Sequence, residues 1–324
     1  MSGFVASRGG IASPRKRSQV AEESRLVRWL LIGVATLFLG VALLLPLSVV
    51  FASAFSKGFE PFWASLALPE TQSAIQLTLV TAAISVPLNA LFGIAAAWLV
   101  SRYDFWGKSA LITLIDLPFS VSPVISGLIF VLLFGAHGVL GPFLSAHDIK
   151  IIFAVPGIVI ATTFVTFPLV AREVLAVMQA QGSDEEEAAL TMGASGLQIL
   201  TRITLPKIRW GVIYGVILCN ARAMGEFGAV SVVSGHIRGQ TNTMPLHVEI
   251  LYNEYNFVGA FAVAALLASL AIITLLVKKA IELDETLKAR RLAQRAETER
   301  RSLVPAALRR PGASLSTRPN ESRA

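Results

Sequence analysis

Six long apolar stretches are the feature that most limits what this chain can fold into. Each holds the roughly 20 mostly apolar residues that a helix needs to cross a bilayer. Backbone polar groups in lipid must be satisfied within the chain, and helices achieve this within one segment. We therefore predict an all-α membrane protein whose six transmembrane helices cover residues 29–51, 74–100, 111–134, 151–171, 209–234 and 258–277.

Composition supports a polytopic membrane protein. The chain has 324 residues and is 54% hydrophobic but only 15% charged, whereas soluble domains carry about 25% charged residues. Its basic residues cluster beside the apolar stretches, which argues against nucleic-acid binding. Ala52-Ser53-Ala54 after the first stretch looks like a signal cleavage site. However, that stretch is longer than the about 7–15 apolar residues of a signal peptide, so we predict an uncleaved first span.

The distribution of lysine and arginine predicts the orientation. Of the 28 basic residues, 24 lie in the N-tail, in the loops 101–110 and 172–209 and from Lys278 onward, all on one side of a six-span chain. The opposite loops hold Lys57, Lys150 and Arg238. Because positive charge is retained on the inner side, we predict that both termini and the loop 172–209 are cytoplasmic.

These observations divide the chain into three parts and exclude several kinds of chemistry. We predict a basic N-tail (1–28), a six-span domain (29–283) and an Arg-rich C-tail (284–324) that is largely disordered after a helical start. No His, Cys and carboxylate cluster has the spacing of metal ligands, and Cys219 is the single cysteine. Gly107-Lys108-Ser109 lacks the first glycine of a phosphate-binding loop, since Arg102 stands there. The sequence therefore predicts no catalytic residue, no metal and no cofactor bound by this chain.

The most patterned polar segment lies in the loop 172–209. Ser183 and Glu186 have the spacing of a helix-capping box. Gly193 is suited to end that helix, and Ser195 to cap a second one. We predict two short helices that meet at Gly193. From the residues alone, an ordinary amphipathic loop and a docking surface for a cytoplasmic partner stay equally open.

The same segment resembles the signature of the membrane subunits of bacterial ABC importers. That signature reads E-A-A, three residues, G, nine residues, then I-x-L-P. The matching positions are Glu187, Ala188, Ala189, Gly193, Ile203, Leu205 and Pro206. The resemblance implies the type I ABC importer permease fold. It also implies that Glu187, Ala188, Ala189 and Gly193 dock the loop into an ATPase subunit and couple ATP hydrolysis to transport.

Two further stretches are similar to sulfate/thiosulfate permease subunits of the CysW type, namely Leu114 to Leu128 and Ala221 to Tyr255. This resemblance implies a bacterial inner-membrane protein that forms a heterodimer with a second permease of the CysT type. It also implies two ATP-binding subunits, which use the ATP, and a periplasmic sulfate-binding protein that docks on the loop 235–257. Because molybdate permeases share a piece like Met224 to Ala229, a molybdate or tungstate permease is the alternative. A stand-alone secondary transporter is a weaker one.

A few polar residues within the spans are candidates for the translocation path. Arg222 and Glu226 are spaced i, i+4 in the fifth span, and charges inside a membrane are costly unless they pair or face water. They either line the path or form a self-neutralising structural pair, and both readings stay open. Ser120 and Ser122 are further path candidates, although serine near proline often repairs the backbone. Asp116 is predicted to be structural.

Overall fold

The structure, a computed structural model, describes residues 25–303, and every regular element in that range is a helix. Residues 1–24 and 304–324 lie outside the described part, and so do the predictions for the N-tail and for the end of the C-tail. Contacts divide the chain into two units, residues 1–52 and residues 53–324.

The first unit contributes α1 (Arg25–Ala54), which contains the whole of the first predicted span. From Leu26 onward this helix is long and apolar enough to cross a membrane, and none of its most apolar window is buried within the chain. Leu37 and Phe38 are among its exposed side chains. A helix that is apolar all round is suited to a surrounding of lipid or of other helices.

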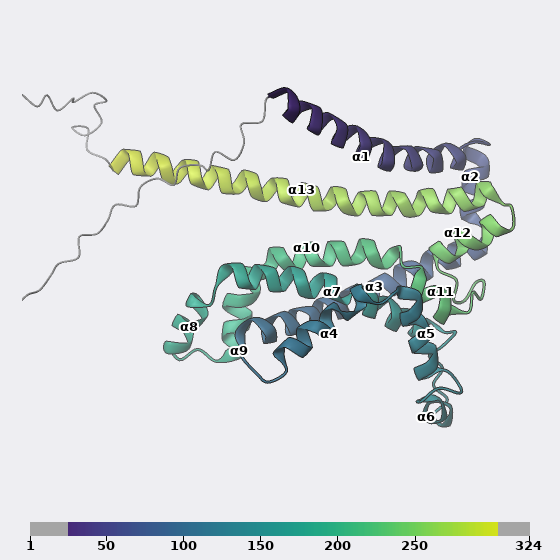
Figure 1. Cartoon of the computed structure of the whole chain (residues 1–324), viewed down its shortest axis with the longest axis horizontal. Helices are drawn as coiled ribbons and strands as arrows, with labels where there is room; N and C mark the ends of the chain where they lie inside the picture. Colours follow the sequence, from purple (N-terminus) through teal and green to yellow (C-terminus); the bar gives the residue numbers. More distant parts are fainter. Residues whose placement is uncertain (1–24, 304–324) are drawn as a thin grey trace, which may run out of the picture. The chain divides into compact units, whose positions relative to one another are not determined.

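The second unit contains the remaining helices, which are labelled in Figure 1. They are α2 (Phe59–Ala67), α3 (Pro69–Arg102), α4 (Lys108–Ser120), α5 (Pro123–Phe134), α6 (Gly141–Ala146), α7 (Val155–Gln181), α8 (Asp184–Thr191), α9 (Gly196–Ile199), the π-helical turn η1 (Leu200–Thr204), α10 (Leu205–Met224), α11 (Gly228–Ser234), α12 (Met244–Asn253) and α13 (Phe257–Leu303).

Six spans emerge from these helices. Among the described residues, α1, α3, α7 and α13 are each long and apolar enough to cross a membrane. Two bent pairs complete the set if each counts as one span: α4 with α5, bent by 110°, and α10 with α11, bent by 53°. Each predicted stretch falls mainly within one of these spans, which confirms the all-α class and the six-span prediction.

The local sequence explains both breaks. Ser122 precedes a proline, and the residue before proline is pushed out of the helical region. Its ψ is 134°, so α4 ends and α5 restarts at Pro123. The second break contains no proline, and there Gly225 and Gly228 flank Glu226 and Phe227. Glycine weakens a helix interior, which makes it a natural place for a break.

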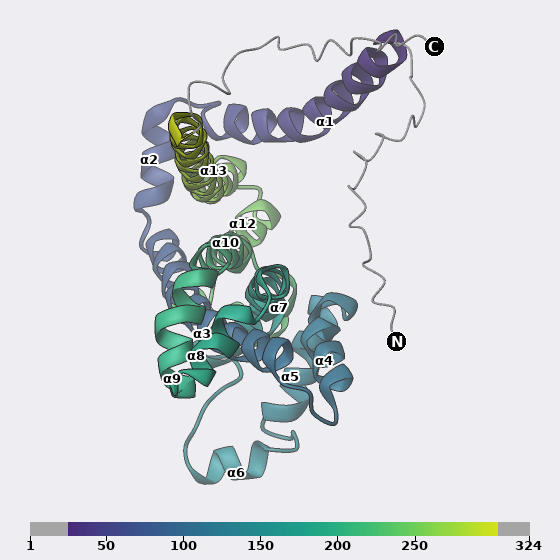
Figure 2. The ribbon, with the colours of Figure 1, turned by 90° about the vertical axis from the view of Figure 1, so that its left-hand side faces the viewer.

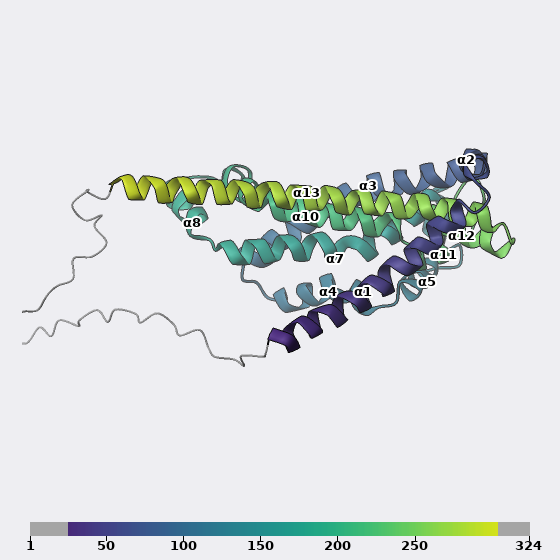
Figure 3. The ribbon, with the colours of Figure 1, turned by 90° about the horizontal axis from the view of Figure 1, so that it is seen from above.

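The core of the second unit is formed by α3, α7 and α10, which lie side by side when seen end-on (Figure 2) and run along the long axis together with α13 (Figure 3). A Cβ atom added to Gly211 would lie 2.8 Å from Val177 Cγ2, and one added to Gly215 would lie 3.1 Å from Val170 Cα. The two glycines therefore bring α10 against α7. This is the close approach expected of a small-xxx-small pair.

Buried polar groups join the same three helices. Asn89 of α3 donates hydrogen bonds to Thr166 Oγ1 of α7 at 2.7 Å and to Cys219 Sγ of α10 at 3.4 Å. All three residues are buried. In an apolar surrounding such hydrogen bonds between helices set the packing register, because no water is present to replace them.

The last helix changes one predicted boundary. The C-tail is predicted to be largely disordered from residue 284, after a helical start. In the structure α13 continues as far as Leu303, so the helical part of the tail covers residues 284–303. Within the described residues, the last span therefore continues as a helix into the tail.

Candidate functional site

Two short helices, α8 and α9, lie at one end of the second unit, opposite the end that holds α11 and α12 (Figure 1). The chain turns out of α7 at Gly182, with φ +70°, and turns again at Gly193, with φ +87°. The predicted meeting of two helices at Gly193 is thus confirmed. The loop is shorter than the predicted 172–209, because α7 runs to Gln181 and α10 starts at Leu205.

The predicted capping box at Ser183 is wrong. Ser183 makes no side-chain cap hydrogen bond, and its hydroxyl donates instead to Glu187 Oε1 at 2.5 Å. Glu186 does not reach back to the start of α8, because the mostly enclosed Arg102 offers it a stronger, charge-assisted partner. A capping box is present one helix later, where Ser195 and Gln198 exchange hydrogen bonds. This confirms the predicted role of Ser195.

Glu186 is the centre of a buried polar cluster. Its Oε2 atom lies 2.5 Å from Arg102 Nε. Its Oε1 atom accepts hydrogen bonds from Arg102 Nη2 at 3.0 Å and from Thr204 Oγ1 at 2.9 Å. Arg102 Nη2 also donates to the carbonyl of Gly182 at 2.9 Å. The end of α3 is thus tied to the start of the loop, to α8 and to η1.

The outer surface of this loop is apolar and exposed. Leu190, Met192 and Leu197 have exposed fractions of 62%, 81% and 72%. A Cβ atom added to Gly193 would meet no atom within 4 Å, so the glycine is open to the outside. We call Leu190, Met192, Gly193 and Leu197 the loop surface. Exposed apolar patches of this kind mark contact sites for other proteins.

The signature residues divide between this surface and the interior. Glu187, Ala188 and Pro206 are exposed, and Ile203 and Leu205 are half-buried. Ala189 is only 5% exposed and packs inside the loop. Its small side chain therefore allows close packing within this chain, a role that spacing along the sequence does not reveal.

The second charged pair lies at the break between α10 and α11. Arg222 Nη1 is 2.7 Å from Glu226 Oε2, and Glu226 Oε1 accepts a hydrogen bond from the Ala229 amide at 3.0 Å. The Glu226 side chain is 1% exposed, whereas that of Arg222 is 43% exposed. The carboxylate therefore holds the start of α11, while the guanidinium presents an open side at the level of the break.

The two helix breaks meet each other. A Cβ atom added to Gly228, just after the second break, would lie 2.9 Å from Pro123 Cβ, just after the first. Ser120 and Ser122 beside the first break are both exposed. The Ser122 carbonyl accepts the Ser126 amide at 3.0 Å and the Ser126 hydroxyl at 3.3 Å, so these contacts do not test the repair role predicted for Ser120 and Ser122.

A third ion pair joins Arg172 to Asp116, and it was not predicted because the loop was expected to begin at residue 172. Arg172 was expected in the loop but lies in α7, where its Nε is 2.6 Å from Asp116 Oδ1 of α4. Its guanidinium also lies 5.1 Å from the centre of the Phe119 ring. These contacts hold α4 against α7, which agrees with the structural role predicted for Asp116.

The predicted docking loop 235–257 is only partly a surface. Residues 235–240 and 252–257 are exposed. Most of the residues between them are buried, among them His247, whose Nε2 lies 3.0 Å from Thr71 Oγ1 of α3. Arg238 bridges the exposed segments by contacting Glu254 and, at 3.4 Å, Glu70. Burial lowers the pKa of His247.

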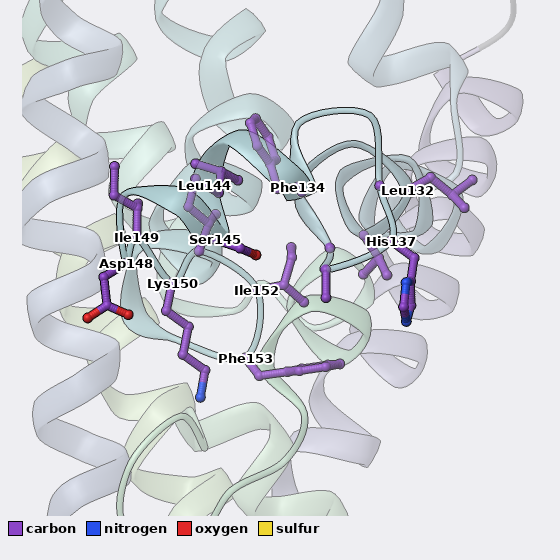
Figure 4. A pocket seen from close by; sticks show the side chains of 16 residues that line it. Leu132, Phe134, His137, Leu144, Ser145, Asp148, Ile149, Lys150, Ile152 and Phe153 are labelled. Carbon is purple, nitrogen blue, oxygen red and sulfur yellow. The ribbon is translucent and has the colours of Figure 1, made fainter.

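A pocket of about 640 Å³ lies in the connection between α5 and α7. Asp148 and Lys150 stand on one side of it and His137 on another (Figure 4), and the rest of the lining is mostly apolar or backbone. Phe153 at its edge donates its amide to Val233 of α11 at 2.8 Å. Within residues 25–303, no group of three or more His, Cys, Asp or Glu residues is arranged to hold a metal ion.

Several helices long and apolar enough to span a membrane, together with an exposed two-helix loop at one end of the second unit, define a polytopic membrane component. The chain belongs to the family described as binding-protein-dependent transport system inner membrane component, whose model matches residues 89–283. Members of this family are membrane components of transport systems and not enzymes.

Relatives and solved structures agree with this membership. The chain is 52% identical over 255 residues to the sulfate transport system permease protein CysW of Escherichia coli K12, covering 79% of this chain and 88% of the relative. It is 34% identical over 244 residues to the sulfate transport system permease protein CysT of Salmonella typhimurium, covering 75% and 88%. A crystal structure of a bacterial ABC transporter that imports alginate shares the fold, with TM-score 0.67 and 19% identity over 79% of this chain and 96% of that one.

Proposed function

We propose that the chain is a permease subunit of an ATP-driven sulfate or thiosulfate importer. The observation that carries this proposal is the 52% identity to a CysW sulfate permease over most of both chains. The exposed loop surface beside the E-A-A and Gly193 positions supports a coupling role for the α8–α9 end.

A permease subunit needs partners. We infer a second permease of the CysT type, because this chain is also 34% identical to one. One of two ATP-binding subunits would dock on the loop surface and the other on the second permease. These subunits would consume the ATP, so that this chain needs no cofactor. A periplasmic sulfate-binding protein would dock at the opposite end, where residues 235–240 and 252–257 are exposed.

The charge distribution supports an orientation in the bacterial inner membrane. Arg102 and Lys207 lie at the α8–α9 end, which is the end of the basic loops. Since basic loops stay on the inner side, this end and both termini would be cytoplasmic. The α12 end would then face the periplasm.

The junction of the two helix breaks is our candidate for the translocation path. The open side of Arg222 offers guanidinium donors that suit an oxyanion. Its pairing with buried Glu226 limits the net charge, so an anion would bind only transiently. Ser120 and Ser122 would contribute hydroxyl groups at the facing break. Helix breaks near mid-membrane are the usual place for such sites in transporters.

Uptake by cells tests the function directly. In a strain without this gene, the chain should restore uptake of labelled sulfate or thiosulfate, and molybdate should fail to compete at similar concentrations. Restored molybdate uptake, without sulfate uptake, would instead establish the molybdate or tungstate alternative. The purified complex should contain the ATPase subunit, and Gly193→Glu on the loop surface should remove it or uncouple ATP hydrolysis from uptake.

A further inference from the structure

The ion pair between Arg102 and Glu186 lies directly behind the loop surface. A pocket of about 310 Å³ is lined both by this pair and by Glu187 and Leu190 of the outer side of α8. The Arg102 and Glu186 side chains are only 13% and 10% exposed. A partner that presses on the outer side of α8 would therefore press against this pair.

The pair connects the loop to a helix that is distant in sequence. Arg102 is the last residue of α3, and Glu186 follows it by 84 positions. The covalent neighbours of the loop are α7 on one side and α10 on the other. Without the pair, movement of α8 would reach α3 only through side-chain packing.

The loop is connected to α10 differently from its connection to α3 through the ion pair. It passes through η1, a π-helical turn over Leu200–Thr204. Such turns have weaker regular bonding and often occur at functional hinges. Thr204 at its end donates to the same Glu186 carboxylate that Arg102 holds. The Glu186 carboxylate therefore connects η1 to the end of α3.

The far end of α3 is bonded to the α12 end of the bundle. Thr78 of α3 accepts the Met244 amide at 2.8 Å, and Thr71 contacts His247 at 3.0 Å. α3 thus runs without a break from the loop to the segment between the exposed residues 235–240 and 252–257. This helix therefore contacts both the loop and the α12 end of the bundle.

We propose that Arg102 is a positioning residue that transmits movement of the α8–α9 loop to α3 by holding Glu186. The proposal rests on the coupling function proposed above. It makes α3 the mechanical link between the ATPase side and the opposite side of the chain. Neighbouring Glu185 shares α8 but has a 66% exposed side chain and pairs with Lys207 of α10, so it does not connect the loop to α3.

Charge reversal tests this link in the full transporter reconstituted in proteoliposomes. Arg102→Glu should keep the ATPase subunit bound but lower ATP hydrolysis stimulated by the loaded binding protein by about tenfold, roughly the effect of one lost charged contact. Arg102→Glu with Glu186→Arg should recover most of the stimulation, and Arg102→Lys should be intermediate. Glu185→Arg, the matched control on α8, should stay within about twofold of the wild type.

Each outcome decides the question. Full stimulation in Arg102→Glu would overturn the proposal. So would a reversed pair that assembles normally but recovers nothing. If Arg102→Glu fails to assemble, the reversed pair and Arg102→Lys still provide the comparison. A wild-type chain that never binds an ATPase subunit would instead contradict the proposed function. The number of ATP molecules used per imported anion should change in a coupling defect, whereas simple instability lowers transport and ATP hydrolysis together.

Discussion

The Arg102–Glu186 and Arg222–Glu226 pairs share a nearly buried carboxylate and differ in their arginine. The guanidinium of Arg102 is enclosed, and its side chain is 13% exposed. That of Arg222 is 43% exposed. The N–H groups of an enclosed guanidinium donate to acceptors of the chain itself and hold its helices together. An open one keeps donors for a ligand.

The surroundings of the two pairs explain this difference. Arg102 ends a continuous helix, and the loop folds back over it, so that Gly182 and Glu186 both accept from it. Arg222 lies just before a helix break that turns the chain away. The bend leaves one side of Arg222 uncovered, while Glu226 is held by the Ala229 amide. The two arrangements therefore predict different effects of mutation.

The largest expected effect is on stability. Arg102→Ala leaves a buried carboxylate without its partner, which typically costs about 3–5 kcal/mol. Each carboxylate keeps one other donor, Thr204 for Glu186 and the Ala229 amide for Glu226. Arg222→Ala should nevertheless cost less, because Arg102→Ala also removes the hydrogen bond to the Gly182 carbonyl. Thermal unfolding of the purified complexes measures both. Equal losses of stability would show that the two pairs are of one kind.

The next effect is on transport. Replacing Arg222 and Glu226 together by glutamine leaves no unpaired charge and keeps the shape, so the complex should stay assembled. Without a guanidinium for the anion, the initial rate of sulfate uptake should fall about 100-fold, equivalent to about 2.7 kcal/mol. The matched control replaces the structural pair of Arg172 and Asp116 by glutamine and asparagine, which should leave uptake within about twofold of the wild type. Uptake close to the wild-type rate would make the Arg222 pair purely structural.

A smaller effect concerns the shape of the loop. Gly193 has φ +87°, where a side chain costs about 1–2 kcal/mol. Gly193→Ala should therefore weaken binding of the ATPase subunit by up to about tenfold. Gly196→Ala is the control, since Gly196 also has open space around it and does not have a positive φ. Equal binding by the two variants would show that the angle at Gly193 is unimportant.

The smallest expected effect is the pH dependence of stability caused by His247, a buried side chain without a directly paired charge. Burial lowers the pKa of His247, so the unfolded chain binds a proton that the folded chain does not. Stability should therefore fall by about 1 kcal/mol as the pH drops through and below about 6.5, the ordinary value. Thermal unfolding at pH 7.5 and pH 5.5 measures this loss. His247→Gln should remove that pH dependence and exposed His147→Gln should keep it; the reverse would contradict the assignment.

Much of this architecture was predictable because it is local. The spans follow from runs of apolar residues, and Gly193 and Ser195 act through their own backbone. The prediction of a capping box at Ser183 was wrong because Glu186 pairs with Arg102, which is distant in sequence. Arg102 and Glu186 lie far apart in sequence, and no spacing pattern indicates their contact. The burial of Ala189 and His247 was missed for the same reason.

The six spans, the two-helix loop and its resemblance to ABC importer signatures can be predicted from the sequence, since each depends on nearby residues. The partner of Glu186, the open side of Arg222 and the contact between the breaks near Pro123 and Gly228 become known from the folded chain. These features depend on which helix faces pack together. Packing depends on the whole chain, because a buried charge or a close helix contact is stable only when both partners are in position.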